Sequence, residues 1–231
     1  MTKGDVLTVE PWMRPFPKLE HVFEMVTDDI RELYLPAVSI EASIVDPRWT
    51  GLLHFVMPVE PFDGGLGEYS SGTYENHYCR HNLIGFRRTK SGRYEPLAAP
   101  LFFTINCARK NKGLFLREQQ INRRETLSEA EEFYAMVHAS FADAQAHFAA
   151  TGQLRETFGK PSPWIYDLGG DAPLNALQDF VPEGRPLSPD GRAFAFVGDL
   201  NTYAFRANGS DGFYMFYDPV DEIVWFSLAF S

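Results

Sequence analysis

The stretch GRAFAFVGDLNTYAFRANGSDGFYMFYDPVDEIVWFSLAFS, residues 191–231, decides the fold of this chain. It holds three apolar runs, at residues 193–205, 213–217 and 223–230, which are separated by NGSDG and DPVD. Asn, Gly, Asp and Pro form turns because they supply positive φ, a pre-set φ or local side-chain hydrogen bonds. Apolar runs between such turns are typical of strands joined by hairpins. The last run, IVWFSLAF, is apolar at both alternating positions, which predicts a strand covered on both faces.

The first half of the chain predicts one short helix and several further strands. A Pro-rich arm at residues 1–20 leads to a helical spacing of apolar residues at 19–35, which Pro36 ends. Apolar runs between turn residues then predict strands at 37–45, 52–59, 74–86, 94–97, 101–107 and 114–117.

The clearest helix is predicted at residues 126–151. The sequence TLSE at 126–129 has the capping-box pattern, and Gly152 supplies a stop. An apolar stripe recurs every three or four residues, at Ala130, Phe133, Tyr134, Val137, Phe141, Ala144 and Phe148. Such a stripe is typical of a helix face that packs on the core rather than of a ligand groove. The Pro- and Gly-rich residues 159–191 predict one short strand and a loop that wraps the sheet.

These elements predict an α+β fold, predominantly antiparallel β-sheet, with one prominent amphipathic helix. We expect one globular domain over residues 1–231. A faint similarity between residues 96–116 and 194–216, each an apolar run followed by a turn and an aromatic run, indicates two related β lobes at 20–125 and 155–231. The helix would join these lobes.

Composition indicates a globular protein of the cytoplasm. Aromatic residues make up 15% of the 231 residues, enough for a large core. The start of the chain lacks the pattern of a signal peptide, and no apolar run approaches the ~20 residues of a membrane span. The two cysteines, Cys79 and Cys107, are therefore expected to be free buried thiols.

Charge is distributed unevenly along the chain, whose net charge is −10. Residues 76–125 hold 11 basic and 3 acidic residues, whereas residues 1–75 hold 13 acids and 5 bases and residues 126–231 hold 15 acids and 5 bases. The ordinary interpretation is internal pairing across the fold. The functional interpretation is a surface of opposed potentials that steers a charged protein partner. Nucleic acid is disfavoured because the acidic chain repels phosphates.

The stretch HYCRH at residues 77–81 raises two chemical hypotheses. On a strand, His77, Cys79 and His81 share one face, and with His54 they provide four ligands for zinc. Such residues spread over ~13 Å of strand, however, so satisfied polar residues are the ordinary interpretation. Pairs of Cys79 or Cys107 with a histidine raise a second hypothesis, a nucleophile for hydrolysis. We predict neither a metal nor a cofactor.

The carboxylates cluster in turns. The sequence DPVD at residues 218–221 is typical of a hairpin turn that is held by side-chain hydrogen bonds. This interpretation is favoured over a pair of catalytic carboxylates, as used by hydrolases. The sequence contains no phosphate loop, dinucleotide fingerprint or Gly-x-Ser-x-Gly elbow.

The second half of the chain resembles the YwqG-like family, bacterial proteins of largely unknown function. The resemblance rests on GKPSPWI at 159–165, FAFVGDL at 194–200 and GSDGFYMFY at 209–217, with Asp199 and Tyr166 where the family has Gln. It implies a mostly β fold with repeated lobes. It implies no established enzyme activity, and it provides no catalytic residues to assign in this sequence. It also implies a link to small acidic immunity proteins encoded beside bacterial toxins.

Together these observations predict a non-enzymatic protein-binding protein, most concretely an immunity protein for a basic toxin. Its expected contact residues are acids in turns and in a Gly-rich loop at residues 62–72, namely Asp63, Glu68, Asp211, Asp218, Asp221 and Glu222. The alternatives are a hydrolase with His/Cys or carboxylate chemistry and a small-ligand module that uses an aromatic cleft.

Overall fold

The computed structural model describes residues 5–59, 65–67, 72–113, 115, 127–156, 160–177, 185–206 and 210–229. Within them it confirms an α+β fold with two antiparallel sheets and one long helix. The smaller sheet has the order β1 (Met13–Pro15), β2 (Tyr34–Glu41) and β3 (Leu52–Pro58). The larger sheet has the order β5 (Tyr94–Pro96), β4 (Leu83–Arg88), β9 (Ile223–Ala229), β8 (Gly212–Asp218), β7 (Ala195–Leu200) and β6 (Ile165–Leu168).

The C-terminal meander is confirmed, because β7, β8 and β9 are antiparallel neighbours. Strand β9 lies between β4 and β8, and all seven of its residues are buried. Val224, Phe226 and Leu228 enter the main core, whereas Ile223 and Trp225 enter a second core on the opposite face. The alternation of β-strand side chains explains why an unbroken apolar run suits this position.

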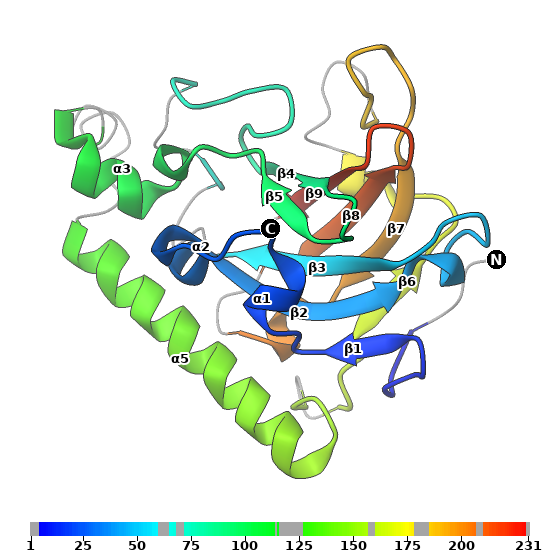
Figure 1. Ribbon diagram of the computed structural model, residues 1–231. Coiled ribbons are helices and arrows are strands. Elements are labelled where there is room, and N and C mark those ends of the chain that lie inside the picture. The colour runs from blue at the N-terminus through cyan, green and yellow to red at the C-terminus, as the bar shows by residue number, and fades with distance from the viewer. Residues whose placement is uncertain are drawn as a thin grey trace.

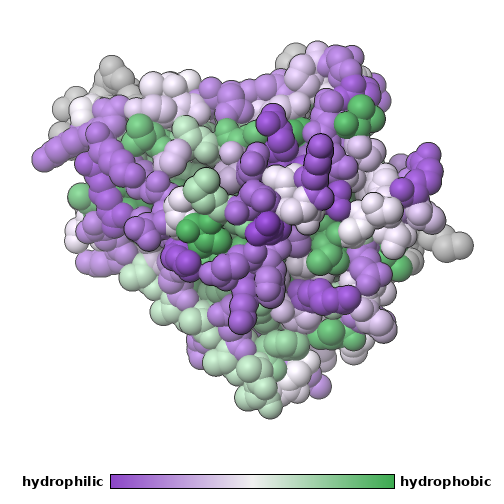
Figure 2. All heavy atoms as spheres, viewed as in Figure 1, coloured by the Kyte–Doolittle hydropathy of each residue, from purple (hydrophilic) through white to green (hydrophobic). Residues whose placement is uncertain are grey.

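The main core lies between the two sheets, whose strands cross at a wide angle in Figure 1. Phe226 of β9 stacks on Phe213 of β8, with ring centroids 4.8 Å apart, and it also contacts Phe55 of β3 at 6.4 Å and Phe86 of β4 at 5.7 Å. We call the face of the six-stranded sheet that bears Trp225, opposite this core, the outer face. On the side shown in Figure 2, hydrophilic residues predominate and apolar residues are scattered.

The long helix α5 (Leu127–Thr151) is confirmed, and its buried residues include Phe133, Val137 and Phe141 of the predicted stripe. Thr126, the first residue of the predicted capping box, lies outside the described residues. The helix runs diagonally along one edge of the molecule in Figure 1. No described helix has the length and apolar character needed to cross a membrane.

Two local predictions in the first third of the chain are wrong. The single helix at 19–35 is two short helices, α1 (Leu19–Val22) and α2 (Asp28–Leu33). The chain is extended between them because Phe23 bridges to Tyr94, and the Thr27 hydroxyl then caps α2 by accepting from Ile30 N at 3.2 Å. Pro36 does not end a helix but lies inside β2, next to a register shift.

The predicted strand at 101–107 is also wrong, because this segment forms a short 3₁₀ turn, η3 (Pro100–Phe102), and the helix α3 (Thr104–Lys110). Short apolar runs buried on all sides suit either structure, and periodicity does not distinguish them. The similarity between 96–116 and 194–216 therefore aligns a helical segment, α3, with a strand, β7. The six-stranded sheet also draws β4 and β5 from the first predicted lobe and β6 to β9 from the second.

Candidate functional site

The β8–β9 turn is the predicted hairpin turn, and its tip is exposed. Asp218 Oδ1 accepts a hydrogen bond from Val220 N at 2.9 Å, which is the expected Asx-type contact. Glu222 has a φ of 54°, a left-handed conformation in which the turn closes. Val220 is 66% exposed at the tip. The turn therefore presents an apolar residue between carboxylates.

The carboxylates of this turn are paired with arginines from elsewhere in the chain. Arg192 contacts Asp190, Asp218 and Asp221, with 3.1 Å between Arg192 Nη2 and Asp218 Oδ2, and we call these four residues the Arg192 cluster. The Asp218 side chain is only 3% exposed, whereas that of Asp221 is 46% exposed.

Glu222 lies beside the cluster and binds a different arginine. Arg88 Nη1 donates to Glu222 Oε2 at 2.8 Å, and the Tyr217 hydroxyl donates to the same oxygen at 2.7 Å. Burial and this carboxylate both raise the pKa of Tyr217. The turn and its neighbour Asp190 thus carry four carboxylates against the two guanidinium groups of Arg88 and Arg192, which leaves an excess of negative charge.

The structure does not gather the other expected contact residues at this turn. Asp211 lies at the opposite end of β8 from Asp218 and accepts a hydrogen bond from the Tyr203 hydroxyl at 2.9 Å. Asp63 and Glu68 lie outside the described residues. Of the six predicted acids, the structure therefore brings together Asp218, Asp221 and Glu222.

The stretch 77–81 is not a strand. Its backbone turns, with bridges between Asn76 and Cys79 and between Arg80 and Leu83, and the strand β4 begins only at Leu83. His77 and His81 are exposed while Cys79 is fully buried, so they do not face one ion. The described residues contain no group of three His, Cys, Asp or Glu residues arranged to hold a metal.

The proposed Cys/His pairs are not formed by the described residues either. Burial raises the pKa of the Cys79 thiol to about 12, which removes the thiolate that a nucleophile needs. His54 lies in β3, where burial lowers its pKa to about 4, and its Nδ1 lies 2.6 Å from the hydroxyl of Ser39. Cys107 is buried in the short helix α3.

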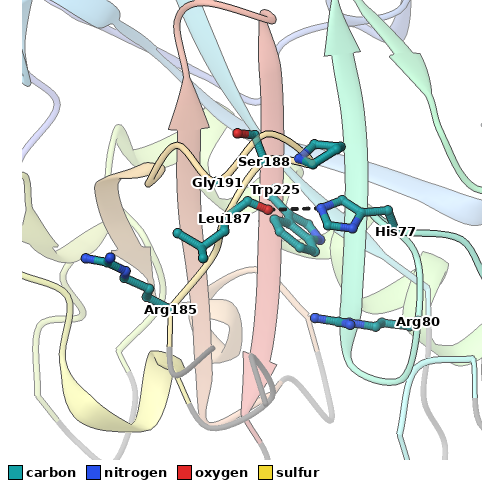
Figure 3. Close-up of a pocket in the computed structure, with 8 residues that line it drawn as sticks. His77, Arg80, Arg185, Leu187, Ser188, Gly191 and Trp225 are labelled. Carbon is teal, nitrogen blue, oxygen red and sulfur yellow. Dashed lines mark hydrogen bonds between the residues drawn. The ribbon is translucent and has the colours of Figure 1, made fainter. Parts of the chain in front are cut away.

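Two hollows open on the outer face of the six-stranded sheet. The first, of about 410 Å³, is lined by His77, Arg80, Arg185, Leu187, Ser188, Pro189, Gly191 and Trp225 (Figure 3). The second, of about 510 Å³, has an aromatic lining of Trp49, Phe194, Phe196 and Phe216. Arg185 lines both hollows. The segment 185–194 thus separates two concave sites, and its residues 185–191 were predicted only as part of a loop that wraps the sheet.

The first hollow, which we call the Trp225 pocket, joins segments that are far apart in sequence. His77 Nε2 lies 2.9 Å from the carbonyl oxygen of Leu187. A carbonyl only accepts, so Nε2 carries the proton of this hydrogen bond. The His77 ring lies 5.5 Å from the Trp225 ring, and Arg80 Cζ lies 5.9 Å from the centroid of the same indole. No motif in the sequence marked Arg185 or Trp225 as site residues.

A comparison of the chain with protein-family models, curated proteins and solved structures finds no match. The resemblance to the YwqG-like family therefore stays a prediction.

Proposed function

We propose that this chain is a non-enzymatic binding protein that recognises the basic surface of a protein partner through the β8–β9 turn. In its most concrete form the chain is an immunity protein that covers the active site of a basic toxin. The observation that carries the proposal is the excess of carboxylates over guanidinium groups around an exposed Val220. The acidic balance of the chain and the family resemblance support it.

The exposed and the buried carboxylates of the turn have different roles in this proposal. Asp221 and Glu222 have side chains 46% and 42% exposed, so they are accessible to a cationic partner. The Asp218 carboxylate is 3% exposed and serves the turn itself. Charges on the rim of an interface mainly raise the association rate, whereas a desolvated apolar tip slows dissociation. Val220 would supply that tip.

The test is a binding measurement between the full chain and the product of the gene beside its own, at low and moderate salt. We expect a one-to-one complex that blocks a toxic activity and associates more slowly as salt increases. Asp221→Lys should slow association roughly ten-fold or more at low salt. Glu132→Lys makes the same charge change at an exposed position of α5 and is the matched control.

Two results would overturn the proposal. The first is the absence of a complex at both salt concentrations. The second is a complex that Asp221→Lys and Glu132→Lys weaken equally, which would mean that net charge rather than the turn determines binding.

A further inference from the structure

We propose that the Trp225 pocket binds a small molecule through an oxyanion group, a phosphate or a carboxylate, which Arg80 and Arg185 neutralise. The proposal concerns a different ligand and different residues from the protein-binding turn, so it stands independently of the proposed function.

The pairing of the arginines is the first observation. Among the described residues, eight arginines contact carboxylates, namely Arg14, Arg31, Arg48, Arg88, Arg93, Arg109, Arg155 and Arg192. Arg206 is buried and donates to the carbonyl oxygen of Pro58 at 3.0 Å. Arg80, Arg87 and Arg185 form no ion pair with any described residue. In a chain of net charge −10, two unpaired arginines that line one pocket indicate a site for an external anion.

The position of Arg80 is the second observation. Its guanidinium lies over the Trp225 indole, a cation–π contact that holds it on the outer face of the sheet. Its Nε is buried but has no hydrogen-bond acceptor in the part of the chain that the structure describes. A buried donor left without an acceptor is unfavourable, and a small rotation of the guanidinium toward the pocket would let an oxyanion accept from it in a charge-assisted hydrogen bond.

The pocket combines a charged end with neighbouring apolar surface. In Figure 3 the two arginines lie on opposite sides of the lower end, and Ser188 lies at the upper end. The Arg185 guanidinium points outward in this view. Because the side chain is exposed, it can change rotamer and turn toward an anion held at Arg80. Leu187 and Trp225 supply apolar surface beside the charged end.

The carboxylates beside residues 188–191 bind a different arginine and form no ion pair with Arg80 or Arg185. The carboxylates of Asp190, Asp218 and Asp221 contact Arg192, as described above. The hydrogen bond between His77 and Leu187 holds the two walls of the pocket together before a ligand binds. A volume of about 410 Å³ suits a small organic anion with a ring or short apolar body.

The experiment is isothermal titration calorimetry of the full chain with inorganic phosphate, phenyl phosphate and benzoate. We expect saturable binding of phenyl phosphate or benzoate, tighter than that of inorganic phosphate because the ring adds apolar contact. Tighter binding of phenyl phosphate than of benzoate would assign the site to a phosphate ester, and the reverse would assign it to a carboxylate. Either result supports the proposal.

Three arginine variants locate the site. Arg80→Gln and Arg185→Gln should each weaken binding roughly ten-fold or more. Arg87→Gln removes an exposed, unpaired arginine of β4 that does not line the pocket, and it should leave binding unchanged. Arg80→Gln also removes the contact with Trp225, so circular dichroism is needed to show that it folds. Arg185 is exposed, and its variant tests the site without that concern.

Two outcomes would overturn the inference. One is the absence of saturable binding of all three probes up to ~10 mM, a concentration that detects even weak small-molecule sites. The other is an equal loss of affinity in Arg87→Gln and Arg185→Gln, which would mean that the anions respond to net charge alone.

Discussion

Asp199 is a mostly buried carboxyl group whose pKa is shifted by the fold, and this shift can be tested by experiment. It lies on β7 opposite Tyr214 of β8 and accepts a hydrogen bond from Phe213 N at 3.2 Å. Burial raises its pKa to about 7, the hydrogen bond opposes this shift, and the charge of Asp167 adds to it. The folded protein therefore keeps a proton on Asp199 over a pH range in which the unfolded chain releases it.

This shift predicts a pH-dependent stability difference between the wild type and Asp199→Asn. The folded pKa is raised, so the wild type loses stability as pH rises from about 4 to about 7, whereas the uncharged amide does not. At about pH 8 the variant should be more stable by about 1–3 kcal/mol, and near pH 4 the two should be close. Urea unfolding at both pH values measures the difference.

The control for this prediction is Asp171→Asn, which removes an exposed carboxylate from the segment that follows β6. Its stability should follow the wild-type pH profile. Identical profiles for Asp199→Asn and the wild type would contradict the assignment of a buried proton to Asp199.

The helix α5 was predicted correctly from the spacing of its apolar residues, but that spacing does not predict which segment the helix packs against. Two residues of its stripe, Phe141 and Phe148, pack against a segment near the N-terminus. They contact Phe16 of the N-terminal arm, with ring centroids 5.5 and 5.6 Å apart, and Phe16 also contacts Trp164 at 6.0 Å. Phe16 has a φ of 45°, a strained conformation that this packing holds in place.

The packing of this aromatic cluster predicts that Phe141→Ala destabilises the protein. Phe141 is 6% exposed, and removal of its ring should lower the free energy of unfolding by about 3–4 kcal/mol because a cavity remains beside Phe16. Met136→Ala, on the same helix but 39% exposed, should change stability by less than about 1 kcal/mol. Denaturant unfolding compares them. A similar loss in both variants would mean that α5 does not pack through this stripe.

At the level of the whole molecule, the two sheets share one core. Residues of β2 and β3 and residues of β4, β8 and β9 belong to the same buried cluster. Tryptophans report on different parts of the molecule: Trp49 contacts Tyr217 at 5.0 Å, Trp164 lies beneath α5, and Trp225 lies in the second core on the outer face. A shared core of this kind should unfold cooperatively.

We therefore predict one unfolding transition for the full chain. Tryptophan fluorescence and far-ultraviolet circular dichroism should give the same midpoint in urea, since strands of both sheets pack in the same main core. Two separated transitions would contradict this and would favour independent lobes.

Local chemistry explains which elements were predicted correctly. The meander, its Asp218 turn and the stripe of α5 depend on turn residues and on the periodicity of apolar side chains, both of which are properties of short segments.

The stretch 77–81 was predicted wrongly as part of a strand. It has an alternating pattern, yet it turns because Tyr78 packs over Gly85. A Cβ on Gly85 would lie 2.7 Å from Tyr78 Cβ, so the turn needs that glycine eight residues away from His77.

The amino-acid sequence alone was sufficient for the fold class, the buried aromatic core and the acidic character, because burial and turn formation follow from the chemistry of neighbouring residues. The charge pairing and the pocket came only from the tertiary structure. Arg192 reaches Asp218, and Arg80 shares a pocket with Arg185, across long separations in sequence. Electrostatic contact depends on distance through space, and only the pairing of strands from both halves of the chain brings these groups within that distance.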